Sequence, residues 1–387
     1  MQMLLCCARR VMSPEIAQRV LTLAAEPLDW DQLLSQSTLH SLAPLLEHSL
    51  RTAVPAGSPG TPFEHQQKET RANALHALAL GSELARVSKR LDEQGIRVLS
   101  YKGPVLAIQA YHDVALRQFD DLDIVLRQRD MCAAHETLLG LGYAAKFAPV
   151  LSPERKNSPI PGEYKYYNET RRVLVELHTE KTLRHFPVVP NLDELFERSV
   201  SVELGGSPAR TFAAEDALIA ICIHGSKDFW DRILWIADVS ELIQSHPQLD
   251  WDAVVSRAES LKAQRMLHVG LLLSSELLDA PLPGSIDGQA RKDTTASALA
   301  SELKNNLLAA NPPCVGVAHR FHIRRRSVRG LLFGWRYAGR LTLLPSDEDW
   351  QDVRLPRTFA PLYLLLRPLR LLQKYGRFGR SANAAAK

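Results

Sequence analysis

Cysteines, long apolar runs and net charge are all scarce in this sequence, and each scarcity argues against a class of protein. The 387 residues include five cysteines, and no two are spaced as Cys-x-x-Cys, so neither a zinc ribbon nor a dithiol redox site is indicated. No apolar run approaches the roughly 18 residues needed to span a bilayer. The first apolar stretch is only about five residues long and precedes its arginines, unlike a secretory signal. We therefore expect a cytoplasmic protein.

Net charge is small but unevenly distributed. The whole chain carries +4, whereas residues 320–387 contain 15 Lys/Arg and 4 Asp/Glu. A basic segment of this kind suits nucleic acid, an anionic membrane surface or another acidic partner. Charge alone does not choose among them.

Hydrophobic periodicity divides the chain into four parts. Helical patterns fill 1–90, short β runs alternate with helices in 91–205, strong helical periodicity returns in 206–285, and 286–387 is basic and helical. The alternation in the second part indicates an α/β unit. Three stretches rich in turn residues predict a break, a mobile loop and a linker, at 53–62, 147–163 and 282–294.

Two aspartates stand in the run FDDLDIVL, which predicts a β strand. Side chains two apart share one face of a strand, so Asp121 and Asp123 point the same way while the apolar residues between and after them face a core. Paired carboxylates repel each other, and a divalent cation such as Mg²⁺ relieves that repulsion. Glu176, mid-strand in VLVELH, is the best candidate for a third carboxylate. His178 shares a face of this strand with Glu176. It therefore lies either beside a metal or in a local hydrogen bond.

Four segments, in order, carry a resemblance to a known family. They are VLSYKGPVLAIQAY, LRQFDDLDIVL, LVELH and ICIHGSKDFWDRILWIADVSELI, and LPRTFAPLYLLLRPLRLLQKYG near the C-terminus is also similar. Together they resemble the nucleotidyltransferase superfamily, the polymerase-β-like fold, and most of all a bacterial group of uncharacterised nucleotidyltransferases. The resemblance covers about residues 75–376. It implies an α+β fold, in which a mixed-sheet core in 91–205 is flanked by helical regions and the helices of 206–285 complete a cleft.

The resemblance also implies a reaction. Asp121 and Asp123 would bind two Mg²⁺ ions, and Glu176 would bind one of them and help to deprotonate an acceptor hydroxyl. A nucleoside monophosphate would pass from an NTP, such as ATP, to that hydroxyl, and pyrophosphate would leave. The acceptor is open: a small molecule, a peptide or an RNA end.

Further residues are implied at the phosphates. Lys102 and the backbone of Gly103 would contact the triphosphate, since glycine permits close approach of N–H groups. Arg117 would bind phosphate or brace the strand of the aspartates. Pro104 follows where the superfamily loop is usually Gly-Ser or Gly-Gly, and it suits the first turn of a helix.

A later run, ICIHGSKDFWDRILWIADVSELI, predicts one continuous helix. His224, Lys227 and Asp231 would share a face of it. Either His224 and Lys227 reach the nucleotide phosphates across a cleft, or this face is solvated. Trp230 and Trp235 are expected in the core.

Two other functions remain open. The Lys-Gly loop and the basic C-terminus are also consistent with a toxin-like transferase acting on tRNA, and a catalytically inactive binding or scaffold module is a third possibility. The C-terminal FAPLYLLLRPLRLLQKYGRF is expected to pack on the body with its arginines outward, with a membrane surface as the alternative. RRRSVR at 324–329 is expected to be a solvated face.

Overall fold

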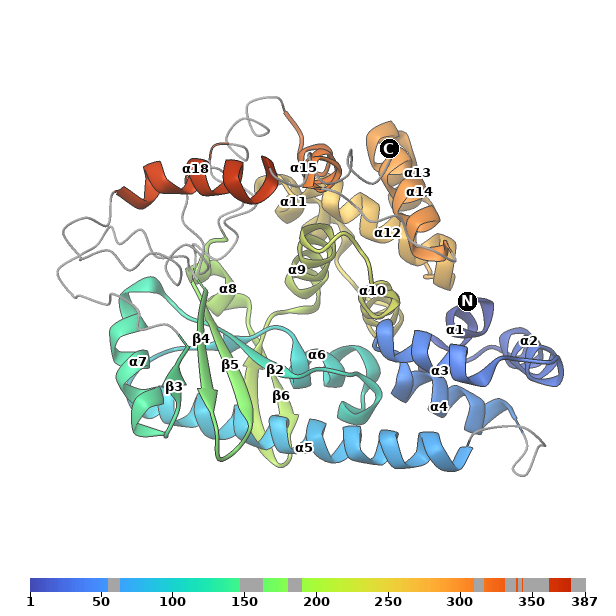
Figure 1. Ribbon diagram of the computed structural model, residues 1–387, viewed down its shortest axis with the longest axis horizontal. Helices are drawn as coiled ribbons and strands as arrows, with labels where there is room; N and C mark the ends of the chain where they lie inside the picture. Colours follow the sequence, from blue (N-terminus) through green and yellow to red (C-terminus); the bar gives the residue numbers. More distant parts are fainter. Residues whose placement is uncertain are drawn as a thin grey trace.

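The structure is a computed structural model that describes residues 1–54, 63–146, 163–179, 190–309, 317–330, 339, 343 and 362–376. Nearly all of the stretch predicted as a mobile loop, and most of the break predicted at 53–62, lie outside these ranges. N-terminal helices lie at one end of the molecule, the sheet lies at the other, and the later helices cover one side of both (Figure 1).

The N-terminal region is helical, as its periodicity predicts. Ser13 caps the second helix by accepting a hydrogen bond from the Ile16 backbone N–H, and α5 continues beneath the sheet (Figure 1). Gly95 follows α5 with φ +72°, the left-handed conformation that ends many helices. The helices are α1 (Gln2–Cys7), α2 (Pro14–Ala25), α3 (Trp30–Leu39), α4 (Ala43–Ala53) and α5 (Phe63–Glu93).

A mixed seven-stranded sheet forms the core, in the order β3-β4-β5-β2-β1-β7-β6. Strand β2 pairs in parallel with β5 and antiparallel with β1, and the prediction of an α+β fold with a mixed sheet is confirmed. The β6–β7 hairpin was not predicted. The strands are β1 (Leu99–Ser100), β2 (Asp121–Val125), β3 (Ala144–Ala145), β4 (Glu163–Asn168), β5 (Val173–His178), β6 (Val200–Leu204) and β7 (Ser207–Thr211).

The two faces of the sheet differ in chemistry. One face is apolar: Leu122, Ile124 and Val175 are fully buried in a core that includes Leu84 of α5 and Leu138 of α7 (Met131–Gly140). The opposite face carries the acidic residues and points toward the later helices. Between β1 and β2 the chain forms α6 (Gly103–Leu106), the π-helical turn η1 (Ala107–Tyr111) and the short η2 (Val114–Leu116).

The later helices pack into a second core above the sheet (Figure 1). The linker predicted at 282–294 is wrong, because most of it forms a regular helix whose Ile286 and Ala290 are buried. The helices are α8 (Leu192–Arg198), α9 (Ala214–Lys227), α10 (Ile233–Ser245), α11 (Trp251–Ser260), α12 (Gln264–Leu278), α13 (Gly284–Lys292), α14 (Thr294–Leu308), α15 (Val317–Arg326) and α18 (Tyr363–Gly376).

The single helix predicted through His224 and Asp238 is wrong. It is broken between α9 and α10, where Phe229 and Trp230 have φ of 62° and 52°. The Trp230 ring folds back over Gly225, where an added Cβ would lie 2.6 Å from the ring. Trp230 is buried in the core, as expected.

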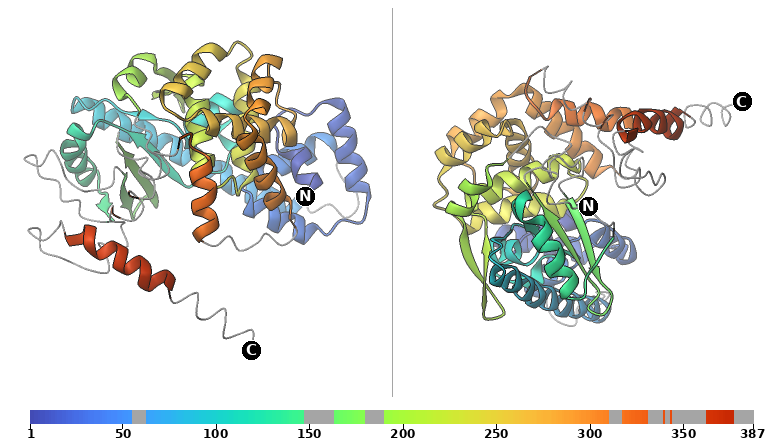
Figure 2. Two further views of the ribbon diagram at one scale, coloured as in Figure 1. Left: turned by 90° about the horizontal axis from the view of Figure 1, so that it is seen from above. Right: turned by 90° about the vertical axis from the view of Figure 1, so that its left-hand side faces the viewer.

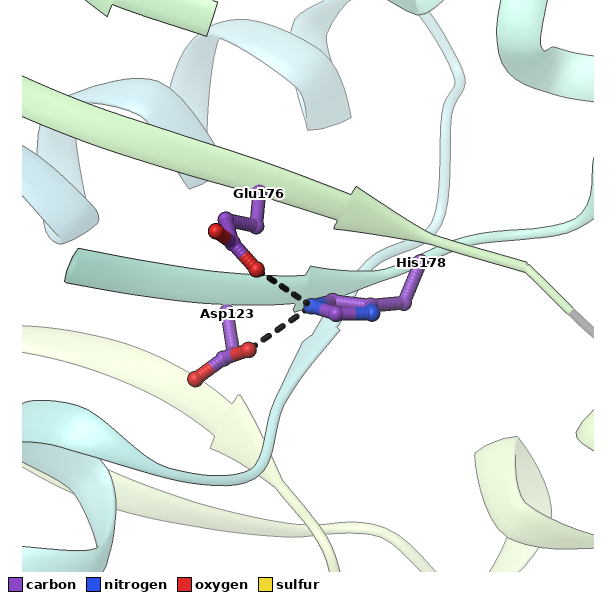
Figure 3. A group of neighbouring side chains, drawn as sticks. All are labelled: Asp123, Glu176 and His178. Carbon is purple, nitrogen blue, oxygen red and sulfur yellow. Dashed lines mark hydrogen bonds and ion pairs between the residues drawn. The ribbon is translucent and has the colours of Figure 1, made fainter. Parts of the chain in front are cut away.

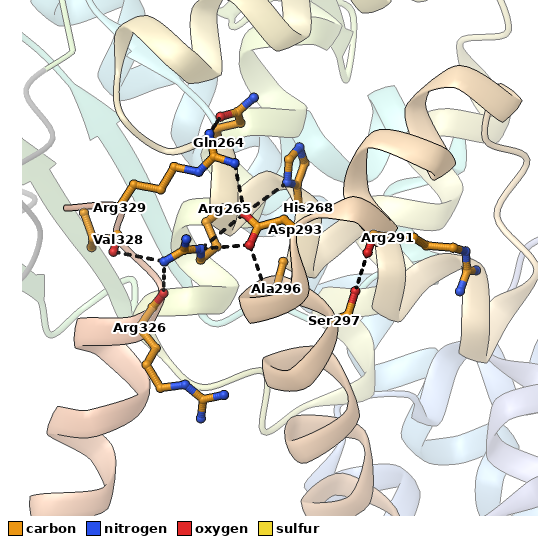
Figure 4. A network of polar contacts seen from close by, with 10 residues as sticks. All are labelled: Gln264, Arg265, His268, Arg291, Asp293, Ala296, Ser297, Arg326, Val328 and Arg329. Carbon is orange, nitrogen blue, oxygen red and sulfur yellow. Dashed lines mark hydrogen bonds and ion pairs between the residues drawn. The ribbon is translucent and has the colours of Figure 1, made fainter.

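The basic segment at 324–329 is held against the body, so its prediction as a solvated face is wrong for these contacts. Arg329 lies 3.3 Å from Asp293, a carboxylate that also accepts from Arg265 of α12 (Figure 4). Arg326 donates to Glu302 of α14 at 2.7 Å. Arg326 and Arg329 are therefore paired with carboxylates of the body, while Arg325 is exposed as predicted.

Helix α18 lies on the outside of the molecule (Figure 2). Its leucines Leu365 and Leu369 are 67% and 57% exposed, whereas Arg367 and Arg370 are half-buried. The expectation that this helix packs with its arginines outward is therefore wrong. No helix among the described residues has the length and apolar character to cross a membrane.

Candidate functional site

Strand register brings the predicted carboxylates to one face of the sheet. Asp123 of β2 lies directly opposite Glu176 of β5. Asp121 precedes Asp123 by two residues and His178 follows Glu176 by two, so all four side chains share that face. The face looks toward α9.

Asp123 is the carboxylate at the centre of this group. Only 2% of its side chain is exposed, Lys102 Nζ lies 3.1 Å from one of its oxygens, and His178 Nε2 lies 2.7 Å from the other. Burial opposes ionisation of Asp123, but Lys102 and His178 outweigh it and hold its pKa well below the usual range. Asp123 is therefore a carboxylate that stays charged while buried.

Glu176 is held from the next strand. Lys165 of β4 lies opposite Glu176 in the ladder, with its Nζ 2.7 Å from the carboxylate. The same ammonium lies 3.3 Å from Glu163. Lysines on two sides thus fix the positions of the two central carboxylates.

Three residues form a cluster with the spacing of metal ligands. Donor atoms of Asp123, Glu176 and His178 all lie within 4.8 Å of one another, and all three side chains are buried (Figure 3). Asp121 is not part of this cluster. The cluster therefore differs from the predicted ligand set, which is Asp121, Asp123 and Glu176. His178 takes the third place because its ring turns back along β5 toward Asp123 (Figure 3).

Negative charge is in excess on this face. Lys102 and Lys165 are opposed by a larger number of carboxylates, namely Asp121, Asp123, Glu163 and Glu176. Burial, followed by the charge of Asp123, raises the pKa of Asp121 to about 6. A divalent cation would supply the missing positive charge, and carboxylate oxygens with one imidazole are a donor set that such ions accept. The residues present therefore fit a metal ion.

The Lys102–Gly103 loop lies against the aspartates. Gly103 has φ +55°, and an added Cβ would lie 3.3 Å from the Asp121 carbonyl oxygen. Both observations favour glycine, since any other side chain would be strained in the left-handed conformation and crowded by the backbone. The loop then enters α6 through Pro104 in its first turn.

Arg117 lies in a fully paired position. Its Nε and Nη2 donate to the two carboxylate oxygens of Asp238, both at 2.8 Å, and the Tyr111 hydroxyl donates to the same carboxylate at 2.9 Å. Arg117 and Asp238 are both buried. This contact joins the segment before β2 to α10, and the role of Arg117 stays a prediction.

His224 and Lys227 approach the acidic face from α9. Burial, then Lys102 and Lys227, hold the pKa of His224 well below its usual value. Lys227, after His178, helps to offset burial and lower the pKa of Glu163 to about 2. These interactions place the last turn of α9 over the carboxylates, although Asp231 lies beyond the end of the helix.

A cavity of about 390 Å³ adjoins the site. His178 and Tyr101 line it at the sheet, and α8, α9 and α11 supply most of its remaining described walls. Sequence patterns do not predict this cavity, because its residues come from segments that are distant along the chain.

The α+β core, with its Asp-x-Asp strand and a third carboxylate on the neighbouring strand, defines a nucleotidyltransferase-like protein. The chain belongs to a family described as uncharacterised nucleotidyltransferases, whose model matches residues 26–279, about two thirds of its length. No curated protein matches it. Among solved structures, an antigenic nucleotidyltransferase-like protein from Paracoccidioides brasiliensis is 13% identical over 53% of this chain and 94% of its own, with a TM-score of 0.30.

Proposed function

We propose that the protein is a metal-dependent nucleotidyltransferase that moves a nucleoside monophosphate from an NTP to a hydroxyl acceptor and releases pyrophosphate. One observation carries this proposal: Asp123 and Glu176 face each other across the β2–β5 ladder beside the glycine turn at Gly103. Membership of the nucleotidyltransferase family supports it. ATP is the first nucleotide to test.

The acidic face would hold the metal. Asp121, Asp123 and Glu176 are its proposed ligands, and His178 is a further donor within reach. Two Mg²⁺ ions held there would supply charge stabilisation for the attacking and leaving oxygens of an in-line displacement at the α-phosphate.

The side chains around the metal ligands have separate tasks. Lys102 lies 3.1 Å from Asp123 and would contact the triphosphate if a bound cation took over the neutralisation of that carboxylate. Backbone N–H groups at Gly103 contact the phosphates. Glu176 takes up the proton of the acceptor hydroxyl as that oxygen attacks.

The last turn of α9 completes the phosphate site in this proposal. Lys227 contributes a positive charge. His224 acts as a neutral hydrogen-bonding group, because its lowered pKa keeps the ring uncharged near neutral pH. Arg117 stays with Asp238 and acts through the position of β2.

Two other functions make different predictions. A toxin-like transferase would modify tRNA and arrest growth on expression, and this arrest would vanish in Asp123→Ala. An inactive scaffold would bind no nucleotide in the presence of Mg²⁺. Against the scaffold, several charged carboxylates are retained on a largely buried face, which is costly unless they are used.

The test is pyrophosphate release from labelled NTPs with Mg²⁺ across a broad set of hydroxyl acceptors. The double variant Asp121→Asn/Asp123→Asn should release pyrophosphate at least about a hundredfold more slowly than wild type. This is the scale of the loss when one charge-stabilising contact is removed. Asp120→Asn is the matched control, because the neighbouring Asp120 side chain is 85% exposed. Equal release by wild type and the double variant would refute the proposal.

A further inference from the structure

The cavity beside the acidic face opens on one side of the proposed reaction centre. Of the three clustered donors, only His178 lines it, and none of Lys102, Gly103 and Asp121 does. The Lys102–Gly103 loop therefore lies away from the cavity, whereas His224 and Lys227, the α9 part of the proposed phosphate site, line its near end. Glu176, proposed to take the acceptor proton, is two residues from His178 on the same strand.

The cavity extends along α9. It follows α9 from Lys227 at the acidic face to Asp216 at the other end, and eleven residues of helix span about 16 Å. Ile219 and Ile223 form its floor along this helix. Tyr101 and Phe212, stacked on each other with ring centroids 5.3 Å apart, form one wall near His178.

The charges at the far end are neutralised by one another. Arg198 donates to both oxygens of Asp216, at 2.9 and 3.1 Å, and also to Glu194 at 3.1 Å. Arg257 donates to Asp216 at 3.1 Å. Among the described residues at this end, two arginines are thus matched by two carboxylates, so these side chains offer no surplus positive charge to an anionic ligand. Ser256, Ser260 and Asn191 add neutral polar groups.

One polar atom at the near end has no partner. His178 Nδ1 is buried and makes no hydrogen bond with any described residue. It lies on the side of the ring away from Asp123 and Glu176 (Figure 3). Nδ1 is therefore a polar atom that a ligand hydroxyl can bind, as an acceptor when Nε2 carries the proton and as a donor when Nε2 binds a metal.

We propose that this cavity binds the acceptor, and that the acceptor is an uncharged small molecule with a ring-sized apolar body and hydroxyl groups. This inference rests on the proposed function. Its apolar body packs on Tyr101, Phe212 and the isoleucines of α9. One hydroxyl binds His178 Nδ1 at the end nearest the acidic face, and polar groups at the other end meet the arginine–aspartate network. Lys227 lines the near end, but its ammonium lies 4.0 Å from Asp228. An RNA end, whose phosphates need several unpaired cations, is therefore disfavoured.

The test compares two fluorescent probes that share a ring system, 4-methylumbelliferyl glucoside, which is uncharged, and 4-methylumbelliferyl phosphate. Fluorescence anisotropy should show the glucoside binding at least about tenfold more tightly than the phosphate. Ser256→Trp, which fills the cavity from α11, should weaken glucoside binding about tenfold. Glu259→Trp is the matched control, because Glu259 is exposed on the same helix but does not line the cavity.

Calorimetry with Mg²⁺ and ATP separates this inference from the proposed function. Ser256→Trp should leave ATP affinity unchanged. Weaker ATP binding in this variant would mean that the cavity holds the nucleotide, and would overturn the inference. The inference would also be overturned if the protein did not bind the glucoside. It would be overturned as well if the protein bound the phosphate probe, or a short RNA ending in CCA, as tightly as the glucoside. If the cavity binds the glucoside but no acceptor yields pyrophosphate, the proposed function fails and the binding site stands.

Discussion

Asp121 and Asp123 lie two residues apart but in different electrostatic surroundings. Asp123 touches Lys102 and His178, which keep its pKa low, whereas Asp121 has no comparably close cation among its described contacts and its pKa rises to about 6. Uncompensated charge is therefore concentrated at Asp121. A cation bound between the two carboxylates would neutralise Asp121 and free Lys102 for another partner.

Gly103 offers a direct test of the phosphate loop. Gly103→Ala should lower the free energy of unfolding by about 1–2 kcal/mol because of its left-handed φ. It should also weaken ATP binding in the presence of Mg²⁺, because the Cβ approaches the Asp121 carbonyl at 3.3 Å.

Gly95→Ala is the control for this prediction. Gly95 has φ +72° but open space where the Cβ would be. The Gly95→Ala variant should lose a similar amount of stability in urea unfolding, and calorimetry should show an unchanged affinity for ATP. If both variants bind ATP as wild type does, the loop has no part in nucleotide binding.

Glu241 predicts a pH dependence of stability. It is buried on α10, its Oε1 has no hydrogen-bond partner among the described residues, and burial raises its pKa from 4.5 to about 7 despite Arg9 and Arg10 nearby. The folded state thus holds this proton more tightly than the unfolded state. Stability from this group is present below about pH 4.5 and is lost as the pH rises through about 7.

Glu241→Gln should remove this dependence. At about pH 8 the variant should be more stable than wild type by about 1–3 kcal/mol in urea unfolding, and the difference should shrink toward about pH 5. A difference that stays constant across this range would show that Glu241 does not titrate in the folded protein.

At the scale of elements, α10 is tied to the segment before β2 by one buried ion pair. Removing a single partner leaves the other charge uncompensated, so Asp238→Ala should cost about 3–5 kcal/mol of unfolding free energy. The double variant Arg117→Met/Asp238→Leu should recover much of that loss, because no charge is then stranded. Urea unfolding of both variants measures how much unfolding free energy the double variant recovers. If the double variant is no more stable than Asp238→Ala, the pair does more than brace two elements.

Sequence patterns predicted the elements that have strong local signals. The long helix before Gly95, the Asp-x-Asp strand and the hairpin that carries Glu176 all form near their expected residues. The break between α9 and α10 escaped prediction because apolar periodicity runs through it. It depends on Trp230 occupying a slot between Gly225 of α9 and Gly270 of α12, a contact between distant segments.

The site was predictable only in part for the same reason. Period-two alternation places Asp121 and Asp123 on one face, but it does not specify that β2 pairs with β5 in the register that sets Asp123 against Glu176. Nor does spacing predict that His178 turns toward Asp123. Strand β6 was missed because four of its five residues are not buried, so it has no clear apolar alternation.

At the scale of the molecule, the proposed site lies between the sheet and the helices above it. A nucleotide held by Lys102 from the sheet and Lys227 from α9 would link the two parts. ATP with Mg²⁺ should therefore stabilise wild type against urea, by about 2.7 kcal/mol when free ATP is a hundred times its dissociation constant. Asp123→Asn should show no such gain, and a gain equal to that of wild type would place ATP elsewhere.

The most direct test of the account is whether the acidic face binds a divalent cation together with nucleotide. Mn²⁺ can replace Mg²⁺ at oxygen-rich sites, and electron paramagnetic resonance counts its free and bound forms. In the presence of ATP, wild type and Asp120→Asn should both bind Mn²⁺ beyond what ATP alone binds, while Asp121→Asn/Asp123→Asn should not. Equal Mn²⁺ binding by wild type and the double variant would contradict the account.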